Sequence, residues 1–81
     1  MKRKLFGIKK LRNSPVYYYL VEETRGTGYT YGVEVRYREE TELIRDITTI
    51  YEDSLRLLNL LRRGLVTPTT LRDVVEDWLV L

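Results

Sequence analysis

Apolar and polar residues alternate most regularly between residues 29 and 38, and this period of two predicts a β-strand. Five apolar residues share one parity of that segment: Tyr29, Tyr31, Val33, Val35 and Tyr37. Within the expected strand at residues 16–23, residues 16–21 are apolar on both parities and most of them are β-branched or aromatic, which is typical of a strand that is covered on both faces. Residues 24–28 contain two glycines, so we expect a short turn that joins the two strands in an antiparallel hairpin.

Two helices are predicted after the strands. Thr49 and Glu52 have the spacing of a capping box, so the first helix should begin at Thr49. Gly64 then lies where a helix commonly ends in the left-handed conformation. Thr67 and Pro68 are suited to the N-cap and first position of a second helix. The apolar residues of this second helix recur at the spacing of a single helical face: Leu71, Val74, Val75, Trp78 and Leu79.

The order of the predicted elements gives the expected fold. With a shorter third strand at residues 43–47, the chain reads β-β-β-α-α and belongs to the α+β class. We expect a three-stranded antiparallel β-meander followed by two α-helices packed on one face. The chain has 81 residues, enough for one small domain, which we place at residues 15–81. Residues 1–14 could form a tail or an early strand, and we assign them as a basic N-terminal tail.

Composition excludes several kinds of chemistry. The chain has no Cys and no His, so it cannot build a disulfide framework, a zinc knuckle or a His-dependent catalytic triad. Carboxylates cluster at residues 39–42 and 73–77, but acidic residues on a turn or an outer helix face are usually solvated rather than bound to metal. We therefore expect no enzymatic activity, no cofactor or metal, and no small-molecule substrate.

Apolar surface that a lone domain would leave uncovered predicts a protein partner. The apolar arc of the first helix spans roughly 220°, which is more than one sheet face needs. The two-sided strand at residues 16–23 also leaves a face to cover. We expect a protein–protein interaction module, self-associating as a homodimer or binding another protein. The candidate interface residues are Tyr17, Tyr19, Leu57 and Leu60. Core packing and base stacking are the other two interpretations of the strand tyrosines.

Charge is distributed unevenly along the chain. The first twelve residues hold six bases and no acid: Lys2, Arg3, Lys4, Lys9, Lys10 and Arg12. These candidate anion contacts support an alternative function, a nucleic-acid-associated accessory protein that binds through the tail, although such a tail can also serve only solubility. No apolar run approaches the length of a membrane span, and the start lacks the apolar region of a signal peptide. A cytoplasmic protein without membrane contact is expected.

Four short motifs follow one another between residues 17 and 79. They read YYLVEE at 18–23, YGVEV at 31–35, DIT at 46–48 and LRDVVEDWL at 71–79. In order and spacing they resemble a family of short, uncharacterised bacterial proteins known as a domain of unknown function. The resemblance covers about three quarters of the chain and leaves the basic tail outside. It implies no activity, but it directs attention to Asp73 and Asp77 as a docking face or as partners for arginines of the sheet.

Overall fold

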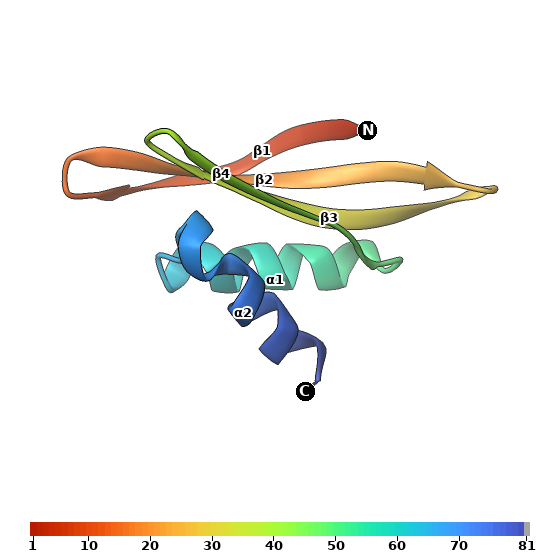
Figure 1. Cartoon of the computed structure of the whole chain (residues 1–81). Coiled ribbons are helices and arrows are strands. Elements are labelled where there is room, and N and C mark those ends of the chain that lie inside the picture. The colour runs from red at the N-terminus through yellow and green to blue at the C-terminus, as the bar shows by residue number, and fades with distance from the viewer. Residues whose placement is uncertain (81) are drawn as a thin grey trace.

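Residues 1–80, which the computed structural model describes, fold into one antiparallel sheet and two helices that lie on the same face of it (Figure 1). The strands are β1 (Lys2–Leu11), β2 (Ser14–Arg25), β3 (Gly28–Tyr37) and β4 (Glu40–Thr48), and the helices are α1 (Tyr51–Arg63) and α2 (Pro68–Leu79). Each strand pairs with the next, so the sheet order is β1-β2-β3-β4. The predicted α+β class is confirmed. The prediction of three strands is wrong, because the sheet has four.

The additional strand is the segment that we expected to be a basic tail. β1 pairs with β2 from Lys2 opposite Glu22 to Leu11 opposite Ser14, with one register shift at Phe6. An edge strand buries little of its surface, and almost all of β1 is exposed, so its hydrophobic pattern is weak. The sequence signal that identifies β1 is therefore its turn rather than its alternation.

That turn is a two-residue connection in which both residues adopt positive φ angles. Arg12 has φ 51° and Asn13 has φ 68°, the conformation of a type I′ turn, which matches the twist of a hairpin. Asparagine tolerates this region better than most residues. The predicted hairpin between β2 and β3 is confirmed, and Gly26 supplies its positive φ of 60°.

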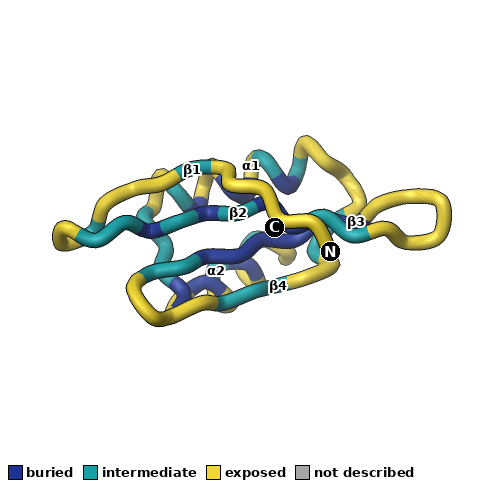
Figure 2. Tube along the Cα trace, turned by 90° about the horizontal axis from the view of Figure 1, so that it is seen from above, coloured by how far each residue is buried: buried dark blue, intermediate teal, exposed yellow. Residues whose placement is uncertain are grey.

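The core lies between the helices and the two middle strands, where Figure 2 shows the deepest burial. Alternate residues of β2 and β3 face the helices, and the central positions of α1 and α2 meet them. The buried cluster consists of Val16, Tyr18, Leu20, Tyr31, Val33, Val35, Leu57, Leu58, Leu61, Leu71 and Val75. The Tyr18 hydroxyl donates a hydrogen bond of 2.9 Å to the Val66 carbonyl, and burial raises the pKa of Tyr18 to about 12.

The helix ends agree only in part with the sequence prediction. Thr67 and Pro68 occupy the N-cap and first position of α2, as expected. The N-cap of α1 is Ile50 rather than Thr49, and it has no side-chain cap. Gly64 does end α1, but with φ −83°, and Leu65 takes the left-handed conformation with φ 52°.

Two backbone hydrogen bonds close this end of α1, from the Leu65 amide to the Arg62 carbonyl and from the Val66 amide to the Leu61 carbonyl. They form a Schellman motif displaced by one residue from the glycine.

Gly32 marks the closest approach between β3 and β4. The register shifts there, because Tyr31 pairs with Thr48 whereas Val33 pairs with Ile44. A Cβ atom on Gly32 would overlap the Ile44 carbonyl oxygen. The extra residues of β4 bulge outward at Asp46, which has φ 55°. The bulge carries Asp46 to the sheet face that the helices leave uncovered.

Candidate functional site

The candidate site is the sheet face opposite the helices, which we call the open face (Figure 1). Partners in antiparallel strands point to the same side, so the register identifies its members. They are Arg3, Leu5, Ile8, Tyr17, Tyr19, Val21, Glu34, Arg36 and Leu43, with Glu23, Thr30 and Asp46 at one end. Within residues 1–80, no second layer of secondary structure lies over this face.

Three residues of the open face are buried although no second layer covers them within residues 1–80. Val21 is 0% exposed, Glu34 is 2% exposed and Thr30, at the end of the face, is 4% exposed. The Glu34 carboxylate lies beneath two guanidinium groups, with Arg3 Nη2 at 2.8 Å from Oε1 and Arg36 Nε at 2.6 Å from Oε2. A buried carboxylate needs such partners, since desolvating an unpaired charge is costly. The arginines therefore form the outer surface at the centre of the face.

Aromatic rings continue this surface along β2. The rings of Tyr17 and Tyr19 stack with centroids 6.4 Å apart and an interplanar angle of 25°. The Arg36 guanidinium carbon lies 5.0 Å from the centroid of Tyr19, within range of a cation–π interaction. Arg36 thus joins the Glu34 ion pair to the tyrosine stack.

Aliphatic side chains border the rings on the β1 side. Leu5 pairs with Tyr19 and Ile8 pairs with Tyr17, and their side chains are 48% and 47% exposed. On the other side, Leu43 of β4 pairs with Glu34 and is half-buried. The face therefore has apolar borders around a charged and aromatic centre.

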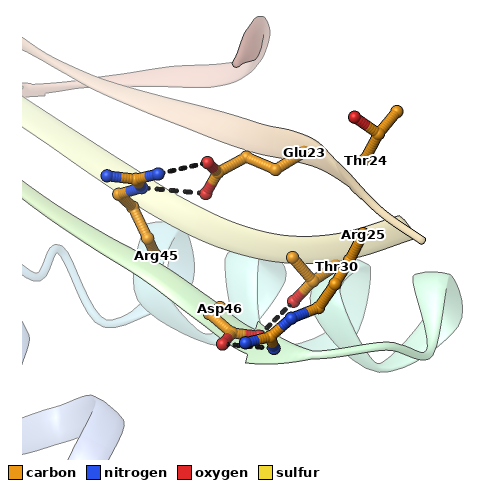
Figure 3. Close-up of a pocket in the computed structure, with 6 residues that line it drawn as sticks. All are labelled: Glu23, Thr24, Arg25, Thr30, Arg45 and Asp46. Carbon is orange, nitrogen blue, oxygen red and sulfur yellow. Dashed lines mark hydrogen bonds and ion pairs between the residues drawn. The ribbon is translucent and has the colours of Figure 1, made fainter. Parts of the chain in front are cut away.

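One end of the open face carries a second ionic cluster around a recess of about 330 Å³ (Figure 3). Arg45 binds the Glu23 carboxylate with two donors, which holds the pKa of Glu23 below its usual value. The Thr30 hydroxyl and Arg25 donate to Asp46, each at 2.6 Å. The Thr30 bond is the main reason that the pKa of Asp46 is lowered. The two acids and two bases balance, so the recess presents no net charge to a ligand.

The structure separates the interface residues that the sequence suggested. Tyr17 and Tyr19 lie on the open face, whereas Leu57 and Leu60 lie on α1, on the other side of the sheet. Leu57 is 0% exposed in the core, so it is not available to a partner and we withdraw it from the candidate interface. Leu60 is 46% exposed. The wide apolar arc of α1 thus serves largely to cover the sheet.

The six basic residues near the N-terminus do not form one patch. Arg3 is paired with Glu34 on the open face, and Lys10 shares that side of β1. Lys2, Lys4 and Lys9 lie on the helix side, where Lys9 donates to the Arg63 carbonyl at 3.2 Å. Arg12 lies in the turn.

The acidic residues at 39–42 and 73–77 are not gathered into a metal-binding group in the part of the chain that the structure describes. Asp73 and Asp77 are exposed on α2, and neither forms an ion pair with an arginine among residues 1–80. The hypothesis that they partner arginines of the sheet therefore has no support in this structure.

Sequence reasoning missed Glu34, the pairing of Arg3 with it and the aliphatic border of β1. Glu34 alternates with the apolar residues of β3, a pattern that indicates a solvated position. The signal that could have found it is Arg36 two positions along, since residues i and i+2 of a strand share a face. Arg3 could not be found, because its role depends on the pairing of β1 with β2.

Comparisons with known proteins identify a family but no relative of known function. No curated protein and no solved structure shows significant similarity to the chain. No helix within residues 1–80 is long and apolar enough to cross a membrane. A family model matches residues 2–81, and this range includes β1, which the resemblance in the sequence had placed outside. The chain belongs to this family, DUF6514, a family of unknown function.

Proposed function

We propose that this protein is a non-enzymatic interaction module that associates with a second copy of itself through the open face. The observation that carries the proposal is the burial of Val21 and Glu34 on a face that has no second layer among residues 1–80. A sheet face that only meets water is normally polar at alternate positions. Here most alternate positions near the centre of the face are apolar, aromatic or internally paired, although the exposed Lys10 and Thr41 also lie on this side.

The chemistry of the open face resembles that of energetic interface centres. Tyrosine and arginine are enriched at such centres, and tyrosine buries a large planar group while losing little conformational freedom. Tyr17, Tyr19 and Arg36 are already held against one another by stacking and by the Glu34 ion pair. A partner that docks on them does not have to order these side chains, which lowers the entropic cost of association.

The size of the face suits a dimer of modest stability. Strands about 4.8 Å apart and rising about 3.3 Å per residue give this sheet a footprint of roughly 500 Å² over its paired length. A standard interface buries about 800 Å² of accessible surface on each partner, and a corrugated face has more accessible area than its footprint. The open face is therefore large enough to hold two copies together.

A two-fold arrangement fits the distribution of side chains across the sheet. Leu5 and Ile8 form the apolar border at β1, and Leu43 forms the border at β4. A two-fold axis parallel to the strands and between β2 and β3 would set the β1 border of one copy over the β4 border of the other. Each arginine–carboxylate cluster would then meet its equivalent, and apolar borders would exclude water around them.

Sedimentation velocity tests the proposal with two matched variants. Ile8→Asp places a charge on the open face, and Leu60→Asp makes the same change on α1 at nearly equal exposure, 47% against 46%. We expect a dimer of the wild type at micromolar concentrations, a monomer for Ile8→Asp, and a dimer for Leu60→Asp. Circular dichroism melts establish that both variants are folded.

Two results would contradict the proposal. One is a monomeric wild type at every concentration measured. The other is loss of the dimer in Leu60→Asp with retention in Ile8→Asp, which would move the interface to the helical side.

A further inference from the structure

A groove runs along the outer edge of the sheet between β1 and the first half of α1. It consists of two adjoining hollows of about 190 and 120 Å³, and Lys4, Leu20 and Tyr51 line both. Phe6 and Leu55 extend the apolar wall, while Lys2 and Glu22 stand at the charged end. The groove therefore combines an apolar floor with lysines at its rim. It lies mainly on the helix side of β1, and Leu5, which belongs to the open face, also lines its second hollow.

The groove is open only beside the first half of β1. Farther along, the Arg62 side chain approaches so closely that a Cβ atom on Gly7 would lie 2.7 Å from its Cδ atom. Lys9 then reaches across to the Arg63 carbonyl, which ties the end of α1 to the strand. The accessible section of edge is thus residues 2–6, where α1 begins beneath the strand.

β1 is an edge strand with an unpaired outer side within residues 1–80. Such an edge presents backbone N–H and C=O groups that a further strand can bind. β1 also carries five bases and no acid: Lys2, Arg3, Lys4, Lys9 and Lys10. Two copies that paired through β1 would bring these charges together. β1 should therefore repel the β1 strand of a second copy and attract an acidic strand.

We propose that β1 and this groove bind an extended, acidic segment of another protein, which adds to the sheet as a strand beside β1. Main-chain hydrogen bonds to residues 2–6 provide affinity, an apolar side chain of the segment enters the hollow above Leu20, and neighbouring carboxylates bind Lys2 and Lys4. This is recognition by β-strand addition with side-chain pockets for specificity. It does not depend on the proposed self-association, because it uses the edge and the helix side of β1.

The experiment measures the affinity of the full chain for a fluorescent peptide in which glutamates alternate with valines. Binding is measured by fluorescence anisotropy. Lys4→Glu reverses a charge at the groove, and Lys10→Glu makes the same reversal on the same strand outside it. We expect Lys4→Glu to weaken binding about tenfold and Lys10→Glu to weaken it less than about twofold, at physiological salt. Phe6→Ser should also weaken binding, because it removes part of the apolar wall.

Amide hydrogen exchange locates the bound peptide. We expect slower exchange of amides in β1 and no change in β4, the other edge of the sheet. Equal losses of peptide affinity in Lys4→Glu and Lys10→Glu would mean that the peptide responds only to the net charge of the protein, and would overturn the proposal. So would protection of β4 alone, or failure of the peptide to bind while duplex DNA binds, which would assign the basic strand to nucleic acid.

Discussion

Glu34 and Gly32 show how single residues of β3 depend on neighbours that are distant in the chain. Glu34 is buried because Arg3 crosses from another strand, 31 positions away, to pair with it. Gly32 is required because the Ile44 carbonyl occupies the space where a side chain would begin. Neither requirement can be read from the alternation of β3, which concerns only the side to which each residue points.

Gly32→Ala is expected to destabilise the protein strongly. The added methyl group meets backbone rather than a flexible side chain, so β3 and β4 must separate and lose pairing. We expect the free energy of unfolding, measured by urea denaturation, to fall by at least about 2 kcal/mol. Gly28→Ala is the matched control, since its nearest neighbour is the Arg25 carbonyl oxygen at 3.9 Å, and it should change stability by less than about 0.5 kcal/mol. Equal effects of the two variants would contradict the close approach at Gly32.

At the scale of elements, prediction succeeded where a segment buries most of one face. The alternation at residues 29–37 and the helical spacing at residues 71–79 each describe a surface that packs against the core, and both elements form. Prediction failed for β1, because an edge strand buries so little that its side chains carry no period. The capping box at Thr49 failed as well, since Thr48 accepts a hydrogen bond from the Ile50 amide and the helix begins later.

Deleting residues 2–11 should therefore unfold or severely destabilise the protein. The deletion exposes the edge of β2, including the fully buried Val16 and Tyr18, to water. We expect a loss of more than about 3 kcal/mol in the free energy of unfolding, measured by urea denaturation. Exchanging Lys2, Lys4, Lys9 and Lys10 for Gln removes charge but keeps the strand, and should cost less than about 1 kcal/mol. A deletion variant as stable as the wild type would show that β1 is dispensable.

At the scale of the whole molecule, the sheet has two faces with different roles. Among residues 1–80, the helices cover one face and complete the core, whereas the open face is covered only by its own arginines, tyrosines and ion pairs. The ion pairs at Glu23 and Asp46, together with the hydrogen bond from Thr30 to Asp46, connect three strands at the end of this face. Because a small domain unfolds cooperatively, the titration of these groups affects the stability of the entire fold.

Acid should destabilise the protein through these carboxylates. The pKa values of Glu23 and Asp46 are lowered in the folded state, chiefly by hydrogen bonds from Arg45 and Thr30 respectively. Their contribution is complete above the unfolded pKa values of about 4 and is lost as pH falls through the folded values. Asn tolerates the φ of 55° at position 46, so Asp46→Asn should keep the local backbone. Because this variant lacks the titrating carboxylate, its free energy of unfolding should fall less steeply with acid than that of the wild type. Parallel curves from urea denaturation at several pH values would contradict this assignment.

The amino-acid sequence by itself determined the α+β class, the central hairpin and both helices, because these follow from local spacing and turn chemistry. Tertiary structure decided that residues 2–11 form a strand, that Leu57 is buried while Tyr17 and Tyr19 remain on the open face, and that Glu34 is paired. The physical reason is that burial and ion pairing are properties of pairs of residues. They depend on which strands become neighbours, and a period along one segment does not contain that information.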